Sequence, residues 1–358
     1  MSHDDVSRRS FLNTTATGIA LASGAAALTP QAVTAAAAPE SAPAKPGSQR
    51  LSMEALKKWE SLGYGMFIHF GMSTFVGAEL PDGKAPASTY APDKLDVDQW
   101  VSVARDAGMK YIVLTSKHVA GHCLWPSKHT DYTVAKSGNT TDVIEAFVKS
   151  CEKRGVLPGF YYCSWDNHNR FGSRTWSDRK EDGPFYTTSV YQTFQTAQLT
   201  ELLTQYGPIA ETWIDIPGLL GRGYRTFLYQ YLASLQPNTV IMMNSGISSG
   251  DKYDVEYAWP SDLIAIERSL PPDAGHSRMR TIEGKEYYMP GEVCDPIGKE
   301  WFYVDGDVPR PAAELAKQFE SCRARGVNLL LDVPPDKHGV IPEASVKALL
   351  QLRKDAKI

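Results

Sequence analysis

The sequence contains no Cys-x-x-Cys pair and no glycine-rich phosphate-binding turn after an early strand. Its five cysteines are an odd number without paired spacing, so zinc and dithiol redox sites are poorly supported and unpaired core thiols are expected. An excess of positive charge is also missing, because 37 basic residues face 41 acidic ones, for a formal net charge of −4. This balance provides no basic surface for nucleic acid.

No long apolar run follows the first forty residues, so stable membrane insertion is not expected. Within those residues, Arg8 and Arg9 stand in the run Ser-Arg-Arg-Ser-Phe-Leu, ahead of an apolar stretch at 19–28 and then small residues. This order predicts a twin-arginine signal peptide over 1–38 and a linker or leader end over 39–50. The protein is therefore expected to be periplasmic or secreted from a bacterium.

From residue 64 onward, short apolar or β-branched runs alternate with amphipathic stretches of helical period. The runs expected to form strands cover 64–71, 111–118, 157–164, 210–216, 239–245, 263–267, 287–292 and 327–333. The stretches expected to form helices cover 97–107, 142–154, 189–206, 223–235, 311–325 and 342–353. The alternation predicts a (β/α)8-like (TIM) barrel over 51–358, irregular in its second half. An open doubly wound sheet is the alternative, but it usually carries the glycine-rich turn that is missing here.

Polar and aromatic residues gather where the predicted strands end. These residues are His69, Lys117, His118, Trp165, Asp166, Asp215 and Glu267. In a barrel, the carboxyl ends of the strands meet on one face and carry the active site. Tryptophan presents a flat apolar surface to a pyranose ring, while histidines and acids bind hydroxyl groups. The pattern therefore favours a sugar site.

Six segments resemble glycoside hydrolase family 29, the α-L-fucosidases. They are FIHFGMSTFVGAE (67–79), GMKYIVLTSKH (108–118), CLWPSKHTDYTV (123–134), GFYYCSWDNHNRFG (159–172), QLTELLTQYGPIAETWID (198–215) and GVNLLLDVPPDKHGVIP (326–342). The CLWPSK and SWDN stretches are more similar to the branch that prefers α-1,3/1,4-linked fucose. The resemblance implies a retaining exo-glycosidase that releases terminal α-L-fucose from oligosaccharides, polysaccharides or glycoconjugates by double displacement.

The resemblance also assigns the catalytic carboxylates. Trp213-Ile214-Asp215 matches the family's Trp-Phe-Asp-Gly strand end, which implies that Asp215 is the nucleophile. Glu267 best matches the glutamate of a Thr-x-Glu-like segment, and Glu292 matches that of a Trp-Glu-x-Cys segment. Glu267 is the preferred general acid/base and Glu292 the second choice, with Glu256 a third candidate on spacing alone.

Further positions carry over as sugar contacts. They are His69, Glu79, His118, His122, Trp125, Tyr162, Trp165 and Trp213. His118 and His122 also have the i, i+4 spacing of some zinc sites, but the glutamate between such histidines is missing and the segment follows a strand. Neither a metal nor a cofactor is expected.

The chain also departs from the family pattern. Val119-Ala120-Gly121-His122 replaces a His-Asp-Gly-Phe segment, and Ile216-Pro217 follows the nucleophile where the family has glycine. The β-sandwich that usually follows the barrel is not expected here. Two alternatives therefore stay open: a related hydrolase for modified fucose or an α-galactoside, and a sugar-binding barrel without catalysis.

Overall fold

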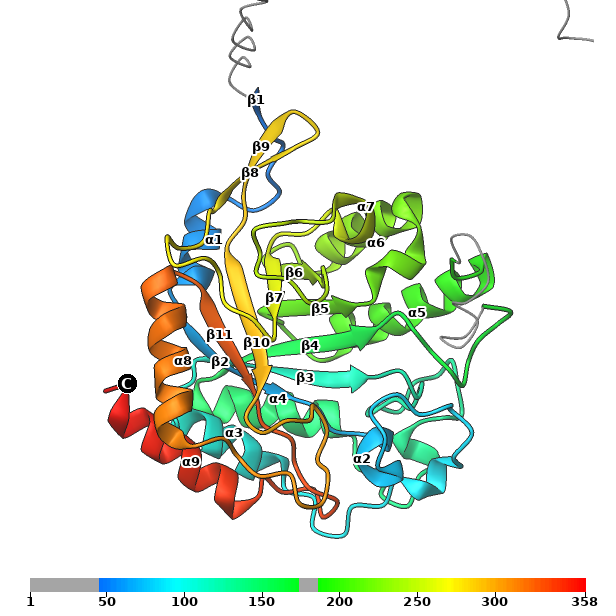
Figure 1. Cartoon of the computed structure of the whole chain (residues 1–358). Helices are drawn as coiled ribbons and strands as arrows, with labels where there is room; N and C mark the ends of the chain where they lie inside the picture. The colour runs from blue at the N-terminus through cyan, green and yellow to red at the C-terminus, as the bar shows by residue number, and fades with distance from the viewer. Residues whose placement is uncertain (1–44, 174–185) are drawn as a thin grey trace, which may run out of the picture. The chain divides into compact units, whose positions relative to one another are not determined.

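The computed structural model describes residues 45–173 and 186–358, and Figure 1 shows them built around one parallel sheet. Its strands are β2 (Tyr64–Ile68), β3 (Tyr111–Lys117), β4 (Leu157–Cys163), β5 (Glu211–Asp215), β6 (Val240–Met243), β7 (Ile264–Glu267), β10 (Gly291–Pro296) and β11 (Asn328–Asp332). The hydrogen-bonded order is β6-β5-β4-β3-β2-β11-β10-β7. The end strands β6 and β7 lie in contact, and Asp262 N donates to Ile241 O at 2.8 Å. The predicted barrel is confirmed, nearly closed.

Helices connect the successive barrel strands, except between β7 and β10, where the described residues contain no helix. The described helices are α1 (Met53–Glu60), α2 (Met72–Val76), α3 (Val97–Asp106), α4 (Val143–Arg154), α5 (Ser189–Gln205), α6 (Arg222–Leu235), α7 (Val255–Ala258), α8 (Ala312–Arg325) and α9 (Glu343–Asp355). Short 3₁₀ turns lie at 87–89, 134–136 and 217–220. Asp142 caps α4, since its carboxylate accepts from Glu145 N at 2.9 Å. Gly155 then ends the helix in the left-handed conformation at φ 67°.

Apolar side chains form two layers, one on each side of the sheet. Met66 and Ile68 of β2 point outward and pack under the helices, whereas Phe67 between them points into the barrel. Helix α1 places the buried side chains of Leu56 and Trp59 in the interior layer. Because both faces of the sheet are covered, most strand residues are apolar, and several strands end in polar residues.

The expected strand at 287–292 is wrong in its bounds. The segment contains the end of β9 (Lys285–Tyr288) and the start of β10, which belong to different sheets. Pro290 lies between them and has no N–H for a ladder, so the chain leaves one sheet there and enters the other. β9 pairs with β8 (Met279–Ile282) in an antiparallel hairpin, seen above the barrel in Figure 1.

The predicted signal peptide and the first part of the predicted linker lie outside the described residues. The end of that linker forms β1 (Lys45–Pro46), which pairs with β9. Arg50 donates to Pro237 O at 2.9 Å and pairs with Asp262. The folded unit therefore begins before residue 51. None of the described helices combines the length and the apolar composition needed to cross a membrane.

Candidate active site

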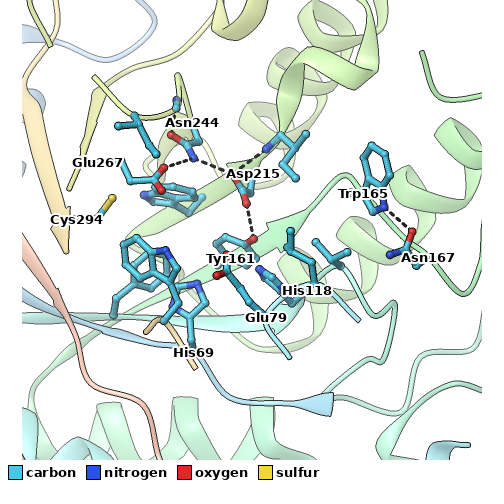
Figure 2. A pocket seen from close by; sticks show the side chains of 18 of the residues that line it. His69, Glu79, His118, Tyr161, Trp165, Asn167, Asp215, Asn244, Glu267 and Cys294 are labelled. Carbon is cyan, nitrogen blue, oxygen red and sulfur yellow. Dashed lines mark hydrogen bonds between the residues drawn. The ribbon is translucent and has the colours of Figure 1, made fainter. Parts of the chain in front are cut away.

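A cavity of about 530 Å³ opens at the carboxyl ends of the strands. Seven of the predicted site residues line it: His69, Glu79, His118, Trp165, Trp213, Asp215 and Glu267. Figure 2 shows how Asp215 and Glu267 converge on Asn244 in this cavity. The structure thus gathers residues that are separated by almost two hundred positions in the sequence.

Asp215 ends β5 and is held by three donors. Its Oδ2 accepts from the Tyr161 hydroxyl at 2.6 Å, while Oδ1 accepts from Asn244 Nδ2 at 2.8 Å and from Ile216 N at 2.9 Å. Hydrogen bonds to an ionised carboxylate are stronger than those between neutral groups. The carboxylate is therefore fixed in position before any substrate enters.

Glu267 ends β7 and shares a donor with Asp215. Asn244 Nδ2 donates to Glu267 Oε2 at 3.3 Å, in addition to its 2.8 Å bond to Asp215 Oδ1. Since both oxygens lie at these distances from one nitrogen, they are at most about 6.1 Å apart. Asn244 Oδ1 in turn accepts from Gly246 N at 2.8 Å, which fixes the orientation of the amide.

The environments of the two carboxylates differ in the way that acid/base chemistry requires. Burial, followed by the charge of Asp215, raises the pKa of Glu267 to about 7. A carboxyl group with such a pKa carries a proton at neutral pH and can donate it. Asp215 has three donors directed at it and is suited to act as an anion. The pair has the arrangement of a proton donor beside a nucleophile.

Aromatic rings form the floor of the cavity. The Trp213 ring stacks on Tyr161 with centroids 5.5 Å apart, and Phe67 lies 5.3 Å from Trp213. Trp301, from the loop after β10, lies 5.2 Å from the His69 ring. This floor provides an apolar surface for a sugar ring beneath the two carboxylates.

Both predicted histidines at the site are buried by their neighbours. His69 Nδ1 lies 2.8 Å from Asp332 Oδ1, so the ring is held by a carboxyl group beneath it. Burial raises the pKa of Asp332 to about 6, against the opposing effect of His69. Burial and the nearby His69 lower the pKa of His118 well below its usual range, and its ring stacks on Tyr161 at 5.6 Å. His118 is therefore neutral, and a neutral imidazole can both donate a hydrogen bond to a hydroxyl group and accept one from it.

Comparison with known proteins identifies the family of the chain. The model of the family described as alpha-L-fucosidase matches residues 81–354. The chain belongs to the α-L-fucosidase family. It is 32% identical over 317 residues to alpha-L-fucosidase 1 of Arabidopsis thaliana, which covers 85% of this chain and 58% of that protein. It is 28% identical to the alpha-L-fucosidase of Dictyostelium discoideum, over 72% of this chain and 53% of that protein.

A solved structure of the same family has a similar fold. Alpha-L-fucosidase isoenzyme 1 from Paenibacillus thiaminolyticus superposes with a TM-score of 0.70 at 27% identity, over 84% of this chain and 74% of that one. The chain spans a little over half the length of the Arabidopsis and Dictyostelium relatives. The family resemblance predicted from the sequence is confirmed.

Glu256 does not line the cavity, and neither does Glu292, the second choice for the general acid/base. Glu292 lies at the start of β10, one layer below Cys294, which does line the cavity. Its carboxyl oxygens accept from the Tyr111 hydroxyl at 2.6 Å and from Trp213 Nε1 at 3.1 Å. Active sites form at the ends of barrel strands rather than at their starts. Glu292 therefore supports Trp213 from beneath, and this position does not fit an acid/base role.

Three predicted sugar contacts also lie away from the cavity. Tyr162 points outward and donates to Gln198 Oε1 at 2.8 Å, because strand side chains alternate and it is Tyr161 that faces the interior. Trp125 is fully buried and donates to Glu201 Oε2 of α5 at 2.9 Å. His122 lies 2.8 Å from Ser137 Oγ, and burial lowers its pKa to about 3. These three residues hold the loops and helices around the barrel.

The sequence interpretation missed Asn244, Tyr161 and Trp301. Asn244 stands near the end of an expected strand, where the other site residues were found, so its position was a usable signal. The alternation of inward and outward side chains would have selected Tyr161. Trp301 lies in a loop without periodicity and carried no such signal. Among the residues that the structure describes, no cluster of three or more metal-ligating side chains occurs.

Glu211 and Glu292 form a buried carboxyl pair within the barrel. Burial and the neighbouring Glu292 raise the pKa of Glu211 well above its usual range, and burial raises that of Glu292 to about 7. Above the ordinary glutamate pKa, the unfolded chain releases a proton that the folded pair retains. The stability of the folded protein therefore falls as pH rises from about 4.3 through the raised values.

Glu211→Gln removes this proton requirement while keeping the side-chain volume. We expect its melting temperature to exceed that of the parent protein by roughly 2–4 °C at pH 8, with a smaller difference at pH 5. Thermal unfolding at both pH values measures this. Glu256→Gln, at an exposed glutamate on α7, is the matched control and should show no such pH dependence. Equal effects of Glu211→Gln at both pH values would contradict the account.

Proposed function

We propose that this chain is a retaining exo-α-L-fucosidase, with Asp215 as the nucleophile and Glu267 as the general acid/base. The observation that carries the proposal is the pair of carboxylates bound to one amide, with oxygens at most about 6.1 Å apart. Retaining glycosidases hold their carboxyl groups ~5–5.5 Å apart, whereas inverting enzymes need about 6.5–9.5 Å to admit a water molecule. The geometry supports the retaining class.

The first half of the reaction transfers the sugar to the protein. An Asp215 oxygen attacks the anomeric carbon while Glu267 gives its proton to the glycosidic oxygen, and the leaving group departs as an alcohol. The raised pKa of Glu267 supports this donation at neutral pH. The Tyr161 hydroxyl and Asn244 amide keep the attacking carboxylate in place.

The second half returns the protein to its starting state. Glu267, now a carboxylate, takes a proton from a water molecule as that water attacks the anomeric carbon. The bond between the sugar and Asp215 breaks, and Glu267 is again protonated. The substrate is a terminal fucose on an oligosaccharide, polysaccharide or glycoconjugate, and the aromatic floor formed by Phe67, Trp213 and Trp301 supports binding of its apolar surface.

The stereochemistry of the product tests the proposal. Two displacements at one carbon restore the original configuration, so we expect α-L-fucose as the first product from an aryl α-L-fucoside. Proton NMR during the first minutes of turnover distinguishes it from the β anomer. The mutarotation rate of added α-L-fucose, measured in the same buffer, is the control. A first product in the β configuration would show inversion and remove Asp215 from the nucleophile role.

A further inference from the structure

Ile216 adopts a backbone conformation that branched residues avoid. It follows Asp215 directly and has φ 52° and ψ 46°, in the left-handed region. In this conformation its N–H donates to Asp215 Oδ1 at 2.9 Å. Glycine would adopt the same conformation with less strain. The backbone conformation at this position therefore favours glycine and gives no reason for an isoleucine.

The segment after Ile216 is held rigidly by Arg225 of α6. This side chain is fully buried and donates to Pro217 O at 3.4 Å, to Glu256 O at 2.7 Å and to Trp259 O at 2.7 Å. It thereby joins the turn after β5 to the segment around α7. Gly218 packs so closely against this segment that a β-carbon there would lie 2.3 Å from the Tyr257 ring. The Ile216 side chain therefore has little freedom to move aside.

Ile216 lines the cavity together with Ile247 and Tyr257, which come from the connection between β6 and β7. Ile247 is 75% exposed, so this wall reaches the solvent-facing mouth of the cavity. The aromatic floor closes the opposite end, which leaves the mouth as the place where a leaving group extends from the scissile bond. The two isoleucines and Tyr257 form an apolar wall on one side of Asp215.

We infer that Ile216 is a specificity-determining residue that favours leaving groups with an apolar face next to the scissile bond. The inference rests on the proposed function, because it names the leaving-group preference of that same site. An apolar leaving group covers the wall and removes it from water, whereas a small leaving group leaves it exposed. The backbone strain at Ile216 is the energetic cost of placing this apolar side chain next to the nucleophile.

Methyl and cyclohexylmethyl α-L-fucosides test the inference, since their leaving alcohols differ in apolar area but little in acidity. We expect the parent protein to have the higher kcat/KM for the cyclohexylmethyl fucoside. Ile216→Gly keeps the backbone conformation and the N–H, and should reduce this preference roughly tenfold. Ile216→Val keeps most of the apolar wall and should retain most of the preference.

The possible results distinguish failure of the proposed function from failure of the role assigned to Ile216. Failure of the parent protein to hydrolyse either fucoside, or any activated aryl fucoside, would refute the proposed function. Hydrolysis of both fucosides with the same ratio in the parent protein and Ile216→Gly would overturn the inference about Ile216 alone. An equal loss on both fucosides in Ile216→Gly would also overturn it, because the side chain would then act on the nucleophile or the fucose ring. Melting temperatures confirm that both variants fold.

Discussion

Asp215→Gly is expected to lower kcat on an aryl α-L-fucoside by at least about 10⁴-fold while the protein remains folded. The physical reason is that the proposed covalent intermediate forms on Asp215, which Tyr161 and Asn244 hold in place by hydrogen bonds, while Glu267 is proposed as the proton donor. The emptied space next to the Tyr161 hydroxyl can admit a small anion. Added azide should therefore restore part of the turnover and release a fucosyl azide, which mass spectrometry detects.

Asp295→Asn provides a matched control for Asp215→Asn. Both residues lie at the carboxyl-terminal ends of barrel strands. Asp295, however, accepts from Gln318 Nε2 at 2.8 Å and does not line the cavity. We expect Asp295→Asn to keep activity within a few-fold of the parent protein, while Asp215→Asn loses it. If Asp215→Gly retained a sizeable fraction of kcat, or azide formed no adduct, the nucleophile would have to be sought elsewhere.

Glu267→Ala should give a loss that depends on the leaving group. Protonation carries much of the barrier when the leaving group is a poor one, so we expect a loss of roughly 10²–10⁴-fold on a fucosyl oligosaccharide. On an activated aryl fucoside, which needs little protonation, the loss should be far smaller. Steady-state kinetics on the two substrates measures this directly.

The pH dependence of kcat provides a second test of the role of Glu267. Because the pKa of Glu267 is raised to about 7, the acid form is lost as pH rises through that value, and kcat of the parent protein should fall on the alkaline side. Glu267→Ala should flatten this limb. Glu292→Ala, which removes the support beneath Trp213, should lower the rates on both substrates to a similar extent and keep the limb. The reverse pattern would exchange the two assignments.

Much of the barrel could be predicted because its strands and helices differ in period. The expected helix at 142–154 differs from α4 by a single residue, and the expected strand at 111–118 differs from β3 by one. The error at 287–292 arose because an apolar run does not reveal which sheet it joins. Pro290, which separates the two strands, was the relevant sign.

Site residues at the ends of strands could be predicted from the sequence. Whether a strand residue lies deep in the barrel or at the cavity was harder to predict. Asp215 and Glu267 end β5 and β7, so the pattern placed them together. Glu292 was grouped with them because a sequence motif does not show whether a residue lies at the start or at the end of a strand. Its place at the start of β10 follows from the pairing of that strand with β11. Asn244 was passed over because asparagine near a strand end is also an ordinary turn former.

The shared amide of Asn244 has a consequence for the whole catalytic cycle. In the proposed double displacement, Asp215 attacks as a carboxylate, and the negative charge moves to Glu267 when Asp215 becomes an ester. An NH₂ group has two hydrogens, so it can face both oxygens at once, and Gly246 N anchors its carbonyl. The charge can then alternate between two sites while the group that solvates it stays still. Each half-reaction is thereby spared the cost of reorienting a dipole.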